Sequence, residues 1–323
     1  MPRIGVVFYR VPVADISGAN PFFLVRVLRE SLARLGWTEG RTIEILWRSA
    51  QGSNARVEEI VVELIRERVD VLALSGNSVI EAAKSRTRRI PIVMLGSTMP
   101  VESKLVESLG RPGGNITGIA ETPMTELFGK RLDILRQAAP NARRIALLHD
   151  GIQTPAALSQ SEAMAAGVGV ALLPYPVDTA RQLEDAMREA AASGAQAVYS
   201  DTSYGIAPAE QPQIRAMVVR HRLPTIHRFG HIITAGFGLM AYEADVREEY
   251  RRAAVFIDRI LRGADPAGLP VEQGIKHRLS INVKLAESIG WKIPPALLLQ
   301  ADEIVRLARA DQRRCRSRGS ALA

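Results

Sequence analysis

The chain has 323 residues and a single cysteine, Cys315, so it can form neither an intrachain disulfide nor a cysteine-based metal site. This scarcity does not fix the compartment, because disulfide-free proteins occur in the cytosol and among exported proteins alike. No apolar run reaches the roughly 18 residues that a membrane-spanning helix requires. The first residues, Met1–Phe8, lead directly into a strand-like run. We therefore expect either a cytosolic protein or one from which a signal peptide has been removed.

The sequence also lacks the short motifs of common enzymes. It contains no Gly-x-Gly-x-x-Gly after the first strand, no Gly-Lys-Ser/Thr and no Gly-x-Ser-x-Gly. His227 and His231 are four residues apart, but the intervening Phe229-Gly230 and the preceding strand argue against a helical zinc pair. No nucleophile and base can be paired from the sequence. These absences predict a protein with no metal site, no cofactor and no catalytic activity.

Lysine is scarce, since it supplies only six of the 42 basic residues and arginine supplies the rest. A net charge of +8 can indicate binding to nucleic acid or to an anionic surface. However, the arginines are interleaved with Glu and Asp along many helices, except in the tail, at Arg313, Arg314, Arg316 and Arg318. This pattern favours solvated helix faces and a flexible basic tail at 311–323, with no nucleic acid as a partner. The sequence assigns no role to the tail or to Cys315.

The chain does contain a regular alternation of strand-like and helical segments. Short apolar runs at 4–8, 42–47, 71–74 and 92–95 predict buried parallel strands, with helical stripes between them. A short helix through Leu105 and Leu109 is expected next. The alternation then restarts, with strands predicted at 145–149, 168–173, 197–200, 225–227 and 238–242. This order predicts an α/β fold of two Rossmann-like lobes, each with a parallel sheet and right-handed crossovers.

A glycine-rich stretch separates the two series: Arg111-Pro112-Gly113-Gly114-Asn115-Ile116-Thr117-Gly118. Glycine and proline interrupt regular structure, so we interpret this stretch as the end of the first lobe and the approach to a crossing into the second. After the second lobe, the sequence predicts a long helix through Tyr250 and Leu261, a strand at 278–281, a helix at 284–289 and a final helix at 295–309.

Ligands of open α/β sheets bind beyond the carboxyl ends of the strands, and this rule selects a small set of loops. The residues of these loops that we predict to bind a ligand are Tyr9, Arg10, Ser75, Gly76, Asn77, Ser78, Ser97, Thr98, Glu121, Thr122, Asp150, Asp201, Thr202, Ser203, Phe229 and Tyr242.

The turn Ser75–Ser78 is the most interpretable of these loops. A small polar turn that opens a helix exposes backbone N–H groups, which suit a carboxylate, although Asn or Ser can also cap them without any ligand. Glu121 and Asp201 are candidates to accept an ammonium group, or are caps and surface acids. Aromatic residues at strand ends, such as Tyr9, Phe229 and Tyr242, line an apolar part of a ligand or belong to the core.

Several motifs resemble a known family. Besides 111–118, they are Gly129-Lys130-Arg131-Leu132, Tyr250-Arg251-Arg252-Ala253-Ala254, Leu269-Pro270-Val271-Glu272-Gln273 and Ile293-Pro294-Pro295. Together they resemble the ABC transporter substrate-binding proteins of the tryptophan and tyrosine type. The similarity runs in order from about residue 3 to about residue 306.

This resemblance implies a type I periplasmic-binding-protein fold with three interlobe crossings. The lobes would comprise 1–119 with 243–272, and 120–242 with 273–310. An extracytoplasmic protein of this kind binds a small molecule between its lobes by lobe closure and delivers it to ABC transporter permease subunits. It is neither an enzyme nor an integral membrane protein, and its signal peptide would have been removed. The ligand implied is an aromatic or branched amino acid, or a related carboxylate.

Three positions depart from the family pattern. Met99-Pro100-Val101 stands where many relatives have Asp-Pro-Val, Thr202-Ser203-Tyr204 where many have Ser-Asp-Pro, and Glu243 where many have glycine. The identity of the ligand is therefore left open. Two other functions are weighed as well. The ligand-sensing domain of a transcription regulator would need a preceding helix-turn-helix, and a two-lobed α/β enzyme would need a catalytic pair.

Overall fold

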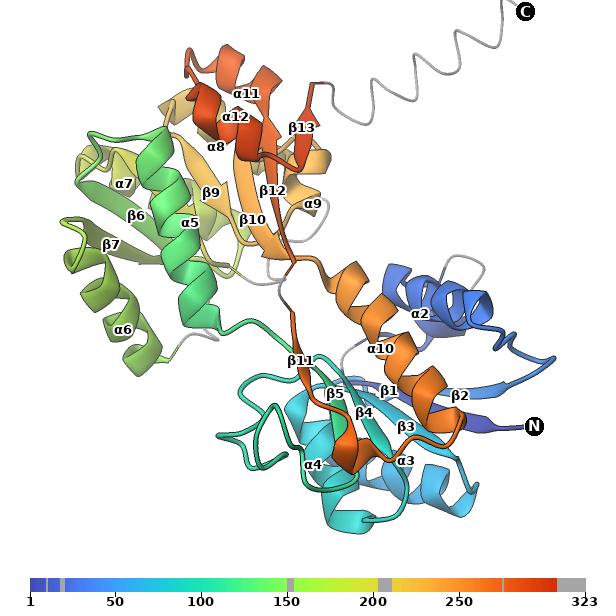
Figure 1. Cartoon of the computed structure of the whole chain (residues 1–323). Coiled ribbons are helices and arrows are strands. Elements are labelled where there is room, and N and C mark those ends of the chain that lie inside the picture. The colour runs from blue at the N-terminus through green and yellow to red at the C-terminus, as the bar shows by residue number, and fades with distance from the viewer. Residues whose placement is uncertain (10, 18–20, 150–153, 203–210, 275, 307–323) are drawn as a thin grey trace, which may run out of the picture. The chain divides into compact units, whose positions relative to one another are not determined.

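The computed structural model describes the chain except for residues 10, 18–20, 150–153, 203–210, 275 and 307–323 (Figure 1). The chain forms two compact units. Unit 1 comprises Met1–Pro123 and Ala244–Lys276, and unit 2 comprises Met124–Glu243 and the chain from His277 onward. The chain therefore passes from one unit to the other three times. The domain limits that the sequence suggests, 1–119 with 243–272 and 120–242 with 273–310, stay a prediction.

Unit 1 contains a six-stranded parallel sheet in the order β11-β5-β4-β3-β1-β2. Its strands are β1 Arg3–Phe8, β2 Glu44–Ser49, β3 Val71–Ser75, β4 Ile92–Leu95, β5 Ile116–Ala120 and β11 Glu272–Gln273. Its helices are α1 Ala14–Ser17, α2 Phe23–Arg34, α3 Asn54–Arg66, α4 Asn77–Arg86 and α10 Val246–Leu261, with a 3-10 turn at Pro266–Gly268.

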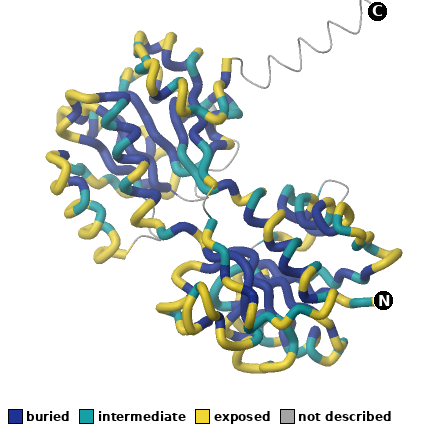
Figure 2. Tube along the Cα trace, in the orientation of Figure 1, coloured by how far each residue is buried: buried dark blue, intermediate teal, exposed yellow. Residues whose placement is uncertain are grey.

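The apolar strands of unit 1 are buried on both faces, as continuous apolar runs predict for a parallel sheet. Val6 and Ala73 are paired between β1 and β3, and neither is exposed. One core cluster joins α2 and α10 to one set of strand side chains, and a second joins α3 and α4 to the other set. The sheet is therefore the middle layer of three, and Figure 2 shows its strands as the buried part of the unit.

Unit 2 contains a seven-stranded sheet in the order β13-β12-β10-β9-β8-β6-β7. Its strands are β6 Arg144–His149, β7 Ala171–Pro176, β8 Ala197–Ser200, β9 Thr225–His227, β10 Met240–Ala244, β12 His277–Asn282 and β13 Glu303–Val305. Its helices are α5 Met124–Ala138, α6 Pro155–Ala166, α7 Ala180–Ala192, α8 Gln211–His221, α9 His231–Thr234, α11 Val283–Ser288 and α12 Pro295–Gln300. Within the described ranges, no helix is long and apolar enough to cross a membrane.

The glycine-rich stretch ends in β5, where Gly118 lies opposite Met94 of β4. Gly118 has a φ of +120°, and a Cβ there would lie 2.5 Å from the Met94 nitrogen and 2.6 Å from its oxygen. Glycine is therefore required at this position by both conformation and space. Gly114, in the same stretch, has no atom within 4 Å of an added Cβ.

Three predicted segments are wrong. The helix expected through Leu105 is a series of turns, in which Met99 and Lys104 have φ values of 48° and 54°. The strand expected at 168–173 begins at Ala171, because Gly169, with φ +73°, continues the preceding turn. The final helix ends at Gln300, and the chain then forms β13, which adds a parallel edge strand to β12.

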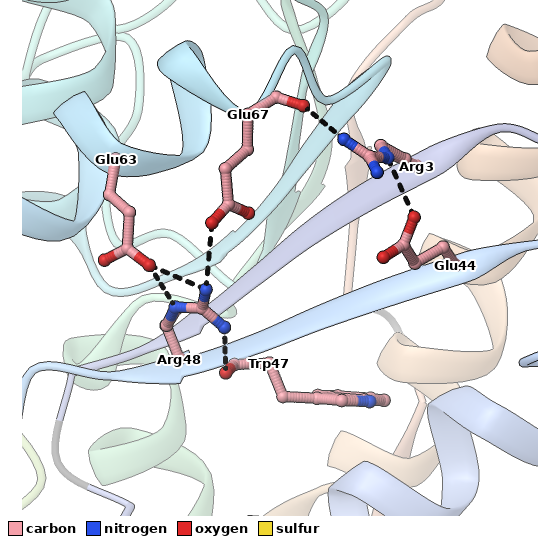
Figure 3. Close-up of polar contacts among 6 residues, drawn as sticks. All are labelled: Arg3, Glu44, Trp47, Arg48, Glu63 and Glu67. Carbon is pink, nitrogen blue, oxygen red and sulfur yellow. Dashed lines mark hydrogen bonds and ion pairs between the residues drawn. The ribbon is translucent and has the colours of Figure 1, made fainter.

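Arginines on the surface of unit 1 pair with nearby carboxylates (Figure 3). Arg48 on β2 lies 2.7 Å from Glu63 and 3.5 Å from Glu67, and Arg3 lies 2.8 Å from Glu44. Such exposed pairs contribute little to stability, typically about 0–1 kcal/mol each. They show that these arginines lie among opposite charges rather than in a continuous basic patch.

Candidate functional site

Polar residues follow β3, β4 and β5 at one edge of the unit 1 sheet, where parallel strands place their carboxyl ends together. Asn77, at the start of α4, joins the first two of these loops. Its amide nitrogen donates to the Thr98 carbonyl at 2.8 Å and to the Ser103 hydroxyl at 3.2 Å. Its amide oxygen accepts from the Ser97 hydroxyl at 2.9 Å and from the Thr98 N–H at 3.1 Å. The Asn77 side chain therefore holds the loop after β4 against the start of α4.

The start of α4 has no side-chain cap, so the alternative that Asn or Ser caps this turn does not apply. Gly76 is the N-cap residue, with a φ of 98° and no side-chain hydrogen bond. The N–H groups of Val79 and Ile80 donate to the Gly76 carbonyl at 3.1 and 3.2 Å. The N–H groups that precede them, at the start of a helix, lack such a partner within the helix and favour an anion. Ser75, Gly76 and Ser78 are all partly exposed. The turn keeps the features of the predicted carboxylate site.

Tyr9 follows β1 and lies beside this turn. Its Cβ is 3.6 Å from the position of a Cβ added to Gly76. Its hydroxyl donates to the Gly52 carbonyl at 3.0 Å and lies 2.9 Å from the Asn54 side-chain oxygen. These contacts fix the Tyr9 ring next to the start of α4, where the sequence predicts that an aromatic residue lines the apolar part of a ligand.

Glu121 and Thr122 follow β5 and complete this edge. The Glu121 N–H donates to the Ser97 carbonyl at 2.9 Å, and its side chain lies against Gly96. Thr122 is buried, and its hydroxyl donates to the Gly274 carbonyl at 2.5 Å. Ser97 is also buried, with 1% of its surface exposed. In unit 1, Glu121, Thr98 and Tyr9 thus present more accessible surface than Ser97 and Thr122.

In unit 2 the corresponding edge is organised around a buried arginine on α5. Arg131 is 1% exposed, and its Nε donates to the Tyr242 carbonyl at 2.7 Å. Its guanidinium lies 3.9 Å from the Asp201 carboxylate and 3.4 Å from the Tyr199 hydroxyl. Asp201 itself is 5% exposed. Arg131 therefore brings the loop after β8 and the end of β10 together.

The Tyr242 ring stacks on His277, with centroids 5.4 Å apart and planes inclined by 23°. Burial raises the pKa of Tyr242, with further contributions from Glu126 and Asp302. Burial lowers the pKa of His277. Both rings are thus neutral near pH 7, which suits contact with an aromatic or aliphatic group.

Phe229 lies in the loop after β9, with the Arg228 guanidinium 5.3 Å from its ring centroid and the His231 ring at 5.8 Å. The next residue, Gly230, donates its N–H to the Glu243 carboxylate at 2.9 Å. Glu243 therefore fixes the Phe229 loop from the end of β10. Thr202 is buried, with its hydroxyl 3.2 Å from that of Ser200.

His227 is 3% exposed, and its Nε2 lies 3.0 Å from the Thr225 hydroxyl. Burial, and to a smaller extent His231, lowers the pKa of His227 to about 4. Across the described residues, no group of three or more His, Cys, Asp or Glu side chains is placed to hold a metal ion. The environment of His227 is that of a neutral core histidine.

The predicted site residues form two described groups, one at the sheet edge of each unit. The unit 1 group joins Tyr9, Gly76, Asn77, Ser97, Thr98 and Glu121 through the contacts above. The unit 2 group joins Asp201 and Tyr242 through Arg131, with Phe229 held by Glu243. Arg10, Asp150 and Ser203 lie outside the described residues, as does Tyr204.

Sequence reasoning gave no binding role to Arg131 and treated Glu243 only as a departure from a family pattern. A signal for Arg131 was available, because it lies three residues after Phe128 and four before Leu135 on the apolar stripe of α5. A charged residue within an apolar stripe requires a buried partner. No comparable periodic signal marks Glu243.

Comparison with known proteins gives a family match over most of the chain. A family model described as ABC transporter substrate binding protein matches residues 16–305. Among curated proteins, the chain is 28% identical over 121 residues to a tyrosine-binding protein of Clostridioides difficile (strain R20291). The match covers 38% of the chain and 34% of the relative, so the chain spans about a third of the length of the curated relative it matches.

Solved structures share the architecture at low identity. An ABC domain from Streptococcus pneumonia, in complex with L-Trp, has a TM-score of 0.73 and 19% identity, covering 94% of this chain and 99% of that one. The ligand-free, open structure of a substrate binding protein with adhesive properties from Clostridium difficile has a TM-score of 0.73 and 17% identity, covering 95% and 99%. These similarities confirm the predicted type I periplasmic-binding-protein fold.

Proposed function

Because the chain belongs to the ABC transporter substrate binding protein family, we propose that it is the solute-binding component of an ABC importer. It would work outside the cytoplasm and deliver a small molecule to permease subunits in the membrane. The family and the fold are those of substrate-binding proteins, so this role needs no bond to be made or broken.

The observation that carries this proposal is the arrangement at the carboxyl edge of the unit 1 sheet. Asn77 fixes the loop after β4 beside the uncapped start of α4, and Tyr9 lies next to the same turn. A rigid helix start beside an aromatic ring is suited to a carboxylate that carries an apolar group. The proposed solute is an aromatic or branched amino acid, or a related carboxylate.

The unit 2 group supplies complementary chemistry in this proposal. The Asp201 carboxylate is suited to the ammonium group of an amino acid, and Glu121 of unit 1 is a second candidate for the same contact. Tyr242 and Phe229 offer aromatic faces to the side chain of the solute. Arg131 and Glu243 hold these residues in place, Arg131 through the Tyr242 carbonyl and Glu243 through the Gly230 N–H.

Calorimetric titration tests the ligand class directly. L-Tryptophan, L-tyrosine, L-leucine and benzoate should be titrated into the protein, with myo-inositol as a probe that carries no charge. We expect saturable binding of at least one of the four carboxylates. Binding of myo-inositol alone would refute the proposed ligand class.

Variants then test the proposed contacts. Replacing Asp201 with Asn should weaken binding of an amino acid by about tenfold or more, and weaken benzoate little, because benzoate has no ammonium group. Glu63→Gln is a matched control, since it removes one negative charge from α3 on the surface of unit 1. Equal affinities in the wild type and Asp201→Asn would exclude Asp201 as the ammonium partner.

A further inference from the structure

A groove in unit 1 lies outside both groups of predicted site residues. It has a volume of about 430 Å³ and is lined by Asp245, Glu248, Glu249 and Arg252 of the α10 region and by Ile119, Glu272, Gln273, Gly274 and Lys276. We call it the α10–β11 groove (Figure 1 shows both elements). All of its lining residues belong to unit 1. Its volume falls in the range of small-molecule sites.

Most carboxylates of the α10–β11 groove already have partners. Glu272 accepts two hydrogen bonds from Arg252, at 2.5 and 2.8 Å. Glu248 accepts from Arg251 at 2.8 Å, and Asp245 caps α10 by accepting from the Glu248 N–H at 3.2 Å. These interactions account for three of the acidic side chains that line the groove.

Glu249 is the exception within the described part of the chain. It is 5% exposed, and its Oε1 is buried without a hydrogen-bond partner. Its carboxyl group points from α10 towards Gly274, where an added Cβ would lie 2.3 Å from Oε1. A buried carboxyl oxygen without a donor is unfavourable, because burial removes its hydrogen bonds to water and no protein donor replaces them.

The charges around the groove favour a cation. Four acidic side chains line it, Asp245, Glu248, Glu249 and Glu272, against the basic Arg252 and Lys276. Burial, followed by the charges of Glu121 and Asp245, raises the pKa of Glu249 to about 7. A cationic donor beside Glu249 would supply both the missing hydrogen bond and the missing positive charge. The residue types do not form a metal site, since no suitable group of three ligands occurs among the described residues.

We propose that the α10–β11 groove is a second ligand site, which binds a small organic amine and pairs its ammonium group with the Glu249 carboxylate. An ammonium is a compact donor of three hydrogen bonds, and Gly274, which lies beside the carboxyl group, has no side chain that would compete with it. The buried Ile119 side of the groove is suited to the carbon chain of the amine. None of the predicted solute-binding residues lines this groove, although Thr122 donates to the Gly274 carbonyl.

Calorimetric titration with n-butylammonium and putrescine tests this site. We expect saturable binding to the wild type at pH 8, and binding about tenfold weaker at pH 6, where Glu249 is mostly protonated. Glu249→Gln should weaken binding at pH 8 by at least tenfold and remove the pH dependence. Its folding is checked by thermal unfolding, and the Gln amide, which has nearly the shape of the Glu carboxyl group, should preserve it. Gly274→Ala, which places a methyl group against Glu249, should also abolish binding.

Glu248→Gln is the matched control, because it removes the same charge from the same groove but from a carboxylate paired with Arg251. It should weaken amine binding less than threefold. Asp201→Asn should leave amine binding unchanged, which separates this site from the proposed solute site. Absence of binding of either amine to the wild type at 10 mM, roughly the weakest affinity that such a titration detects, would overturn the inference. So would equal weakening of amine binding by Glu248→Gln and Glu249→Gln, or loss of amine binding in Asp201→Asn.

Discussion

Replacing Arg131 with methionine should destabilise unit 2 by about 3 kcal/mol. The guanidinium is almost fully buried and donates to the Tyr242 carbonyl at 2.7 Å. A hydrogen bond from a charged donor contributes about 1.5–3 kcal/mol. Methionine has a similar length and preserves the packing of the α5 stripe, so the loss reflects polar interactions more than a cavity.

The total of about 3 kcal/mol includes the ion pair with Asp201. Removing one member of a buried pair typically costs about 3–5 kcal/mol, because the other charge stays in a poorly solvated place. The Arg131–Asp201 distance of 3.9 Å is at the outer limit of an ion pair, so we take the lower end of that range for the whole substitution. Arg131→Lys keeps the charge but not the planar geometry and should lose less than Arg131→Met.

Urea unfolding followed by Trp291 fluorescence measures the effect in unit 2, because Trp291 packs against the unit 2 core. The other two tryptophans, Trp37 and Trp47, pack in unit 1 and should be replaced by phenylalanine in all variants. Because every variant then carries the same two Trp→Phe replacements, differences in unfolding free energy report on unit 2 alone.

A double-mutant cycle of Arg131→Met and Asp201→Asn separates the contribution of the ion pair with Asp201 from that of the hydrogen bond to the Tyr242 carbonyl. If Asp201 and Arg131 are coupled, the double variant should be at least about 1 kcal/mol more stable than the sum of the single changes implies. A loss below about 1 kcal/mol in Arg131→Met, or strict additivity in the cycle, would refute the role given to this arginine.

Three other substitutions test separate parts of the structure. Gly118→Ala should lower the free energy of unfolding in urea by more than about 3 kcal/mol, because the new Cβ would lie 2.5 Å from the Met94 backbone. Gly114→Ala, the control, should change it by less than about 1 kcal/mol. Equal effects of the two substitutions would refute the close approach of the Gly118 and Met94 backbones. Asn77→Ala should cost about 1–3 kcal/mol and raise amide hydrogen exchange in the loop after β4, and unchanged exchange would contradict its role. The folded pKa of His227, about 4, lies below that of an unfolded histidine, about 6.5, so the unfolded chain binds more protons and stability falls as pH drops from 6.5 to 4. His227→Gln should reduce this acid-induced loss, by up to about 3 kcal/mol, and an unaltered pH profile would show that His227 is not responsible.

The alternation of strands and helices was predictable because several buried strands, such as β4, are continuous apolar runs. The strand predicted at 4–8 is one residue shorter than the observed β1, Arg3–Phe8. The strand predicted at 197–200 has the bounds of β8, Ala197–Ser200. Errors occur where tertiary pairing overrides local propensity. Residues 303–305 continue an apparently helical pattern, yet they are captured as an edge strand by β12.

The candidate site was predictable only at the level of loops. The rule that ligands bind beyond strand carboxyl ends selects Asn77 and Thr98, but the sequence does not show that one side chain holds the other loop. Long-range partners such as Arg131 and Asp201, or Gly230 and Glu243, depend on which strands become neighbours. A single sequence contains no direct record of those neighbours.

Unit 1 is built from two separate segments of the chain, Met1–Pro123 and Ala244–Lys276, so it can be completed during synthesis only after the second segment has been made. Helix α10 and strand β11 follow residues 124–243, which all belong to unit 2. Ala253 and Ile257 of α10 are fully buried against the unit 1 core. At about 5–20 residues per second, a ribosome would add α10 only many seconds after the last of β5. A chain truncated near residue 243 would thus keep β1 to β5 but lose β11 and the helix α10 that covers the sheet, which leaves an aggregation-prone apolar face.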